Sequence, residues 1–224
     1  MVYSLYIFPF FMGKSLKKEI IRKLFHLMEV PLLLAYSIIR YIWSEQIAIF
    51  VLTAMLLVLL EIEYVRLEVR PKIPRIVNVF RPKERNNVTG TVFFIMATII
   101  CFAVFDYSIA VMALIMTVFG DLSSALVGIK WGKHKLFREK TTEGFLAGLI
   151  VNVLVGALFL HEHVIIFLPM AIIASVVELV TNKLDDNLTV PLFSGFTGQM
   201  IVYAAGVQLV EFPRLFDWLF TFFQ

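Results

Sequence analysis

The sequence predicts an all-α integral membrane protein, in which a single domain spanning residues 1–224 forms a bundle of about seven transmembrane helices. The first observation is composition: 60% of residues are hydrophobic and only 17% are charged, whereas soluble domains carry about 25% charged residues. The second is a series of apolar runs, each close to the roughly 20 residues that cross a bilayer as a helix. The third is the confinement of basic residues to a few gaps between these runs.

The apolar runs define the predicted helices in order along the chain. Their approximate bounds are 24–43, 46–62, 90–105, 107–128, 143–160, 163–180 and 188–210. Pro191 falls near the start of the last run, where we expect it to break or kink the helix, since proline lacks a backbone donor.

Two shorter apolar segments flank the predicted spans. Residues 2–12 are apolar and aromatic but too short to cross the membrane, so we expect an interfacial or re-entrant segment. This segment lacks the basic region and the cleavage site of a secretory signal, and we expect it to be retained. Residues 212–224 mix aromatic and charged side chains, which is typical of a short helix at the opposite interface.

The basic residues predict the orientation of the bundle. Of 20 Lys and Arg residues, 18 fall in four gaps, at 14–23, 66–85 and 130–140 and at Lys183. Short basic loops stay in the cytoplasm, so the amino end is expected there and the carboxyl end on the far side. All four gaps then open onto one surface, and a single site can draw on them together.

The net charge of +3 and the pI near 9.0 do not indicate a nucleic-acid-binding protein. The basic residues lie directly beside membrane spans, where anionic lipid headgroups and a phosphorylated small molecule are the expected partners. The sequence is also compatible with a homo-oligomer.

Four ionisable residues lie within the cytoplasmic halves of predicted spans, namely His26, Glu29, Asp121 and Glu178. Charged groups in a membrane are costly and therefore indicate functional candidates. Each one alone could instead be a side chain that reaches the interface or bonds a neighbouring helix. Their position on one side favours a shared site.

Residues 120–144 form the densest group of candidate site residues. Asp121, Ala125, Gly128 and Gly132 recur at helical spacing and make a small face that either admits a nucleotide or packs against another helix. The basic loop 130–140 then leads into a helix start, where unpaired N–H groups favour an anion. This is either a phosphate-binding loop or a plain cytoplasmic loop.

Two further stretches complete the candidate site. Glu178, Asp185, Asp186 and Asn187 supply oxygen ligands of the kind that Mg²⁺ uses together with substrate phosphates, although Asp185 fits a helix cap equally well. Near the amino end, Arg22, His26 and Glu29 share a helix face. His26 is either a general base or a group that orients a lipid headgroup.

These motifs resemble, in their order along residues 22–191, the polyprenol kinase family, which includes dolichol kinase, phytol kinase and the CTP-dependent diacylglycerol kinase. The residues that carry the resemblance are Arg22, Lys23 and His26; Glu63 and Arg66; Gly120, Asp121, Ala125, Gly128 and Gly132; Lys140, Thr141, Glu143 and Gly144; and Glu178, Asp186, Asn187, Val190 and Pro191. Each motif is weak alone, and their ordered combination carries the resemblance.

The resemblance implies transfer of the γ-phosphate of a nucleoside triphosphate, typically CTP, to the hydroxyl of a polyprenol, dolichol or similar lipid alcohol. Asp121 and Asp186 would then hold Mg²⁺ with support from Asn187 and Glu178. Lys140, helped by Lys130 and Arg138, would stabilise the transferring phosphoryl group, and His26 or one of the acids would accept the proton. Nucleotide contacts are expected at Arg22, Lys23, Gly120, Gly128, Lys130, Gly132, Arg138, Thr141, Glu143, Gly144 and Asn187.

Two alternatives remain at this stage. The family is distantly similar to phosphatidate cytidylyltransferases, which also use CTP and make a CDP-lipid. A small transporter would need polar residues through the depth of the membrane, and the far half offers little beyond Asn152, Gln199 and Gln208. The expected location is the cell membrane of a prokaryote or the endoplasmic reticulum membrane of a eukaryote, with the active site facing the cytosol.

Overall fold

The computed structural model describes residues 27–69, 87–182 and 184–209. In these residues the chain folds into seven α-helices, a short π-helical extension and one β-hairpin. The bounds are α2 Glu29–Ile42, α3 Glu45–Tyr64, η1 Val65–Val69, α4 Gly90–Val104, α5 Tyr107–Trp131, β1 Lys135–Phe137, β2 Lys140–Thr141, α6 Thr142–Leu160, α7 Val164–Val180 and α8 Asp186–Ala205.

Each predicted span corresponds to one of these helices, which confirms a helical bundle. Among the described residues, four helical segments are long and apolar enough to cross a membrane: Glu45–Glu68, Tyr107–Trp131, Thr142–Leu160 and Asp186–Ala205. The helices α4 and α7 are apolar but shorter, and α2 has 14 residues. The count of seven crossings and the cytoplasmic amino end therefore stay predictions, and the two flanking segments predicted at 2–12 and 212–224 lie outside the described residues.

The last helix differs from its predicted course. Pro191 lies inside α8, which begins five residues earlier and continues to Ala205, so the predicted break is wrong. The alternative, a kink at Pro191, stays a prediction. The helix also stops short of residue 210. Gly206 adopts a left-handed conformation with φ of 62° there, and its N–H bonds back to the last turn, an arrangement that commonly terminates helices.

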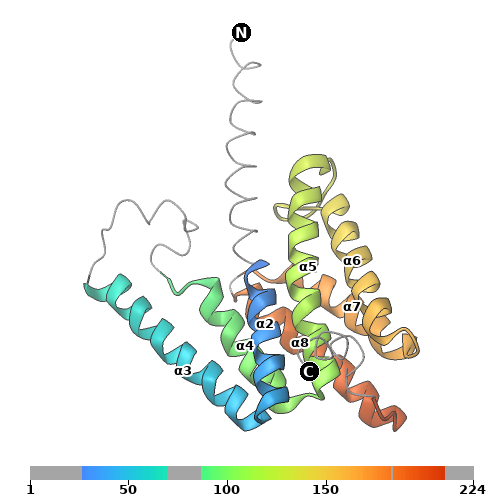
Figure 1. The fold of residues 1–224 in the computed structure, drawn as a ribbon. Helices are drawn as coiled ribbons and strands as arrows, with labels where there is room; N and C mark the ends of the chain where they lie inside the picture. The colour runs from blue at the N-terminus through green and yellow to red at the C-terminus, as the bar shows by residue number, and fades with distance from the viewer. Residues whose placement is uncertain (1–26, 70–86, 183, 210–224) are drawn as a thin grey trace.

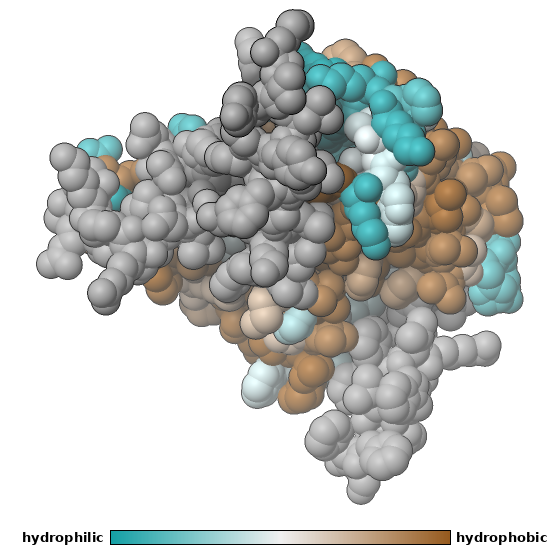
Figure 2. All heavy atoms as spheres, turned by 90° about the horizontal axis from the view of Figure 1, so that it is seen from above, coloured by the Kyte–Doolittle hydropathy of each residue, from teal (hydrophilic) through white to brown (hydrophobic). Residues whose placement is uncertain are grey.

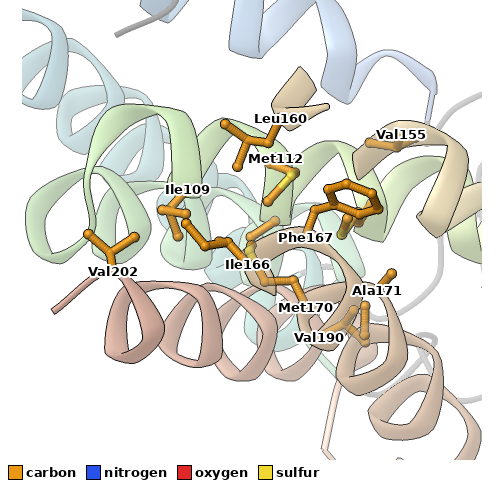
Figure 3. Packing of buried hydrophobic residues seen from close by; sticks show 13 residues of the cluster. Ile109, Met112, Val155, Leu160, Ile166, Phe167, Met170, Ala171, Val190 and Val202 are labelled. Carbon is orange, nitrogen blue, oxygen red and sulfur yellow. The ribbon is translucent and has the colours of Figure 1, made fainter. Parts of the chain in front are cut away.

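Successive helices run in alternating directions, so the ends of α5 and α7 and the starts of α6 and α8 face the upper side of the molecule in Figure 1. The helix α5 is central because it contributes to both hydrophobic clusters. One cluster joins α5 to α6, α7 and α8, and Figure 3 shows Met112 of α5 close to Phe167 and Met170 of α7. The other joins α5 to α2, α3 and α4.

The β-hairpin was not predicted, because residues 130–140 were expected to form a loop. Its strands pair antiparallel with an irregular register, and Arg138 at the turn has a positive φ of 54°. The carboxylate of Glu143 in the first turn of α6 organises its base. It accepts the N–H groups of Lys133 at 3.1 Å and His134 at 3.3 Å, and it contacts the His134 ring at 2.7 Å.

Candidate active site

A pocket of about 340 Å³ lies at the upper end of the bundle, where α5, the hairpin and α6 meet α7 and α8. Its described lining residues come from five elements or their connections: Asp121, Ser124, Ala125, Gly128, Ile129, Glu139, Lys140, Thr141, Gly144, Phe145, Ser175, Glu178, Leu179 and Asp186. The pocket therefore joins two stretches that the sequence singled out separately, 120–144 and 178–187.

The upper walls of the pocket exist because α5 and the hairpin extend beyond the ends of α7 and α8 (Figure 1). The eleven residues from Asp121 to Trp131, the end of α5, correspond to about 16 Å of helix. Viewed from above, hydrophilic residues gather at this end of the described surface and hydrophobic residues flank them (Figure 2). The pocket thus lies where polar and apolar surface meet.

Four carboxylate residues line this pocket: Asp121, Glu178 and Asp186 from three different helices, and Glu139 from the turn of the hairpin. Glu178 is buried, and its Oε1 accepts a hydrogen bond from the hydroxyl of Ser124 at 2.5 Å. The ammonium group of Lys140 lies 3.8 Å from the same oxygen and also donates to the main-chain carbonyl of Glu178. The cation offsets part of the cost of burying this carboxylate.

Among the polar residues that line the pocket, the sequence analysis missed Ser124, Glu139 and Ser175. Ser124 is three residues from Asp121, and Ser175 is three residues from Glu178, so each shares a helix face with a predicted acid. That spacing was the available signal. The hydroxyl of Ser175 donates to the carbonyl of Ala171 at 2.9 Å and accepts a bond from Asn152 at 3.0 Å.

Asn152 of α6 is a buried polar residue that contacts Ser175, one of the pocket residues. It is 1% exposed, and its Oδ1 has no hydrogen-bond partner among the described residues. This side chain occupies the space that a Cβ on Gly120 would need, since such an atom would lie 2.5 Å from Oδ1. Gly120 therefore admits Asn152 and is not itself among the pocket residues.

The small face of α5 packs against α6 and also contributes to the pocket lining, and its predicted contact with a nucleotide stays a prediction. Gly128 and Gly144 line the pocket and also face each other across the contact between α5 and α6, where a Cβ on Gly144 would lie 3.2 Å from the Cα of Gly128. Gly132 ends α5 and abuts Thr141, and it does not line the pocket. Helix packing and access to the pocket thus depend on the same glycines.

The basic segment 130–140 contributes only some of its residues to the pocket. Lys140 and Thr141 face the pocket, and the Thr141 hydroxyl caps α6 by accepting the N–H of Gly144 at 3.2 Å. Lys130 and Arg138, both predicted to contact phosphate, do not line the pocket. Each instead lies over a neighbouring aromatic ring.

The neighbouring acids Asp185 and Asp186, at the start of α8, have different contacts. Asp185 caps the helix, because its Oδ1 accepts the N–H of Asn187 at 3.1 Å, as one interpretation of the sequence predicted. Asp186 lines the pocket. The side chain of Asn187 is buried and is not one of the lining residues.

The remaining predicted site residues are not placed at the pocket. Arg22, Lys23 and His26 lie outside the described residues. Glu29 is buried at the start of α2. Glu63 and Arg66 form an ion pair of 2.5 Å, and Arg66 also donates to the carbonyl of Asn87 at 2.7 Å, which ties the end of α3 to the segment before α4.

The carboxylates were tested for their fit to Mg²⁺. No group of three His, Cys, Asp or Glu side chains within the described ranges is arranged to hold a metal ion by itself. Mg²⁺ bound with a nucleotide needs only one or two carboxylates, since phosphate oxygens and water complete its coordination. Asp121 and Asp186, which line one pocket from two helices, fit that requirement.

Comparison with known proteins gives one partial similarity. Over 75 residues the chain is 32% identical to the CTP-dependent diacylglycerol kinase 1 of Schizosaccharomyces pombe, and the matched stretch covers 33% of this chain and 34% of that protein. No protein-family model matches the chain, and no solved structure does. The chain is thus similar, over about a third of each sequence, to an enzyme whose name describes a lipid kinase that uses CTP.

Proposed function

We propose that this protein is a membrane-embedded lipid kinase that transfers the γ-phosphate of CTP to the hydroxyl of a lipid alcohol. One observation carries the proposal: Asp121, Lys140, Glu178 and Asp186 come from separate elements and line a single pocket at one end of an apolar bundle. The partial similarity to a CTP-dependent diacylglycerol kinase supports the same class of reaction.

The position of the pocket suits substrates of opposite character. A lipid alcohol keeps its chain in the bilayer and presents its hydroxyl at the interface, whereas a nucleotide arrives from water. The lining combines carboxylates and a lysine with Ile129, Phe145 and Leu179, so both kinds of surface are available. Catalysis of phosphoryl transfer depends chiefly on positioning and on charge stabilisation.

The roles of the pocket residues follow from their contacts. The acceptor oxygen attacks the terminal phosphorus, the bond from that phosphorus to the bridging oxygen breaks, and the nucleoside diphosphate leaves. Lys140, held at the end of α7 by the main chain of Glu178, stabilises the charge that develops on the phosphoryl oxygens. The hydroxyl proton passes to a carboxylate of the pocket or to His26.

Asp121 and Asp186 would hold Mg²⁺, with Glu178 in support. The ion, when bound, neutralises phosphate charge and orients the phosphoryl group for in-line attack. Glu178 is already engaged by Ser124 and Lys140, so its main role is to fix the lysine and the hydroxyl in place.

Two classes of acceptor are proposed. The ordered motifs resemble kinases of polyprenol, dolichol and phytol, and an isoprenoid alcohol is the first candidate. Diacylglycerol is the second, because the partial match is to a protein named for that substrate.

The test is an assay of the purified protein in detergent with γ-labelled CTP and a panel of polyprenols, phytol, geranylgeraniol and diacylglycerol, with unlabelled ATP as competitor. We expect label in one lipid and release of CDP. Release of pyrophosphate with formation of a CDP-lipid from phosphatidic acid would replace the proposal with a cytidylyltransferase. Absence of both products would favour a transporter.

A further inference from the structure

The hairpin and the end of α5 carry a second surface, whose residues do not line the pocket. We define the hairpin surface by six residues: Lys130, Trp131, Lys133, Leu136, Phe137 and Arg138. Its three large apolar side chains are well exposed, Trp131 at 55%, Leu136 at 45% and Phe137 at 39%. The exposure of three large apolar side chains distinguishes the hairpin surface from an ordinary hydrophilic loop.

Within the described residues, the cations of the hairpin surface have no acidic partner. Lys130 lies 4.3 Å above the ring of Trp131, and the guanidinium of Arg138 lies 5.0 Å from the ring centre of Phe137. Neither these two nor Lys133 forms an ion pair with a carboxylate in the described part of the chain, whereas Lys135 pairs with Glu139 at 3.7 Å. Three positive charges are therefore available to an external anion.

The hairpin lies at the membrane boundary. The helix α6 has 19 residues, or about 28 Å, which matches the hydrocarbon thickness of roughly 30 Å. Its exposed residues Leu146, Ile150, Leu154 and Leu158 recur every four positions and form an apolar stripe that starts in the second turn. Because the hydrocarbon begins that close to Thr142, strand β2, which ends one residue earlier, lies at headgroup level.

From these observations we infer that the hairpin surface docks onto the headgroups of anionic phospholipids in the surrounding bilayer. Trp131, Leu136 and Phe137 insert at the interface, where tryptophan is enriched in membrane proteins. Lys130, Lys133 and Arg138 bind lipid phosphates and other anionic headgroup atoms, as basic residues beside a span do. The inference does not depend on the proposed kinase reaction.

The test uses Trp131 as a local probe. A Trp43→Phe, Trp218→Phe protein retains Trp131 as its single tryptophan, since the sequence has three. It is reconstituted in vesicles of phosphatidylcholine and phosphatidylglycerol in which one lipid or the other carries brominated chains. We expect brominated phosphatidylglycerol to quench Trp131 about two- to fivefold more than brominated phosphatidylcholine at equal bromine content. Equal quenching by both lipids, or none by either, would overturn the inference.

Two sets of substitutions identify which cations cause the stronger quenching by brominated phosphatidylglycerol. Changing Lys130, Lys133 and Arg138 together to glutamine should abolish it, while changing Lys14, Lys17 and Lys18 to glutamine, which removes the same charge elsewhere, should leave it intact. If the preference survives the hairpin substitutions, the inference is wrong.

Two measurements on the single-tryptophan protein need no further substitution. High salt should lower the preference, because it screens exposed charges, and an unchanged preference in high salt would contradict docking by these cations. Soluble CTP or glycerophosphate should not displace the lipid. Loss of the preference on adding either one would assign these cations to a free phosphate ligand.

Discussion

At the scale of single residues, the central group is the Glu178 carboxylate. It is 7% exposed and takes contacts from a hydroxyl on α5 and from the ammonium group at the end of the hairpin. Burial of one charge beside another is tolerated when hydrogen bonds satisfy both. Glu178 therefore positions Ser124 and Lys140 relative to each other. In the proposed reaction, the pocket acids Asp121 and Asp186 hold the metal ion and face the substrate phosphates.

The adjacent acids Asp185 and Asp186 provide a matched pair. We expect Asp186→Asn to lower kcat on the order of 10²-fold or more, because a charge that faces the phosphates is lost. Asp185→Asn should keep near-wild-type turnover, since asparagine caps a helix as well as aspartate does. Kinase assays of both purified variants make the comparison. Equal activity of the two variants would remove Asp186 from the site.

Lys140 has a comparable control in the same hairpin. Lys140→Gln should lower kcat by about 10²-fold, because the cation beside the phosphoryl group is lost. It should also destabilise the fold, because the buried Glu178 carboxylate loses its cation. Lys135→Gln removes an exposed charge that is paired with Glu139 and should leave kcat unchanged. Steady-state kinetics with CTP as the varied substrate would measure both. A purely higher KM in Lys140→Gln would instead indicate ground-state binding of the nucleotide.

Sequence reasoning identified some site residues and not others for physical reasons. Asp121, Lys140 and Asp186 stand out because charged groups beside or inside apolar runs are rare and costly. Ser124 gives no such signal, since a serine in a helix is ordinary. The orientation of the Arg138 side chain could not be predicted from the sequence either, because its contact with the Phe137 ring depends on a turn with positive φ.

At the scale of elements, the contact between α5 and α6 positions both walls of the pocket. The two helices approach closely at Gly120, Gly128 and Gly144, and Asn152 fills the space beside Gly120. Asn152 cannot move away without losing its bond to Ser175 at 3.0 Å. The packing of α5 against α6 is therefore coupled, through Asn152, to the position of Ser175 in the pocket.

A double-mutant cycle tests this coupling. Gly120→Ala should destabilise the protein by about 1–3 kcal/mol, because its methyl group would overlap Asn152. In an Asn152→Ala background the same substitution should cost much less, which gives a coupling of about 1 kcal/mol or more. Unfolding in mixed micelles with increasing dodecyl sulfate would measure each variant. Additive effects would show that the two residues do not constrain each other.

The helices were predictable from the sequence, and the hairpin was not. Apolar runs of helical length mark the helices directly, and ends such as Ser44, a cap whose hydroxyl accepts the N–H of Ile47, fall within a few residues of the predicted bounds. Strands of three and two residues are too short to show an alternating pattern. The hairpin depends on Glu143, which binds two backbone N–H groups at its base.

At the scale of the whole molecule, the alternating helix directions place the hairpin and the turn between α6 and α7 at opposite ends (Figure 1). Glu139 and Glu162 mark these ends, with side chains 91% and 76% exposed. If α6 crosses the membrane, the two residues lie on opposite sides of it. The orientation itself, with the pocket toward the cytoplasm, rests on the distribution of basic residues.

Cysteine labelling tests this arrangement. The single native cysteine, Cys101, is fully buried, so it should react little. In intact cells an impermeant maleimide should label Glu162→Cys and spare Glu139→Cys until the membrane is opened. Labelling of Glu139→Cys from outside would reverse the orientation, and labelling of both from one side would exclude α6 as a span.

The position of the pocket residues along the chain also bears on biosynthesis. Every described lining residue falls between Asp121 and Asp186, and Asp186 is the first residue of α8. A nascent chain that has released α5, the hairpin, α6 and α7 from the ribosome still lacks Asp186, which α8 contributes to the pocket. The site is completed only when the last described helix enters the membrane, so chains truncated before α8 should be catalytically silent wherever they insert.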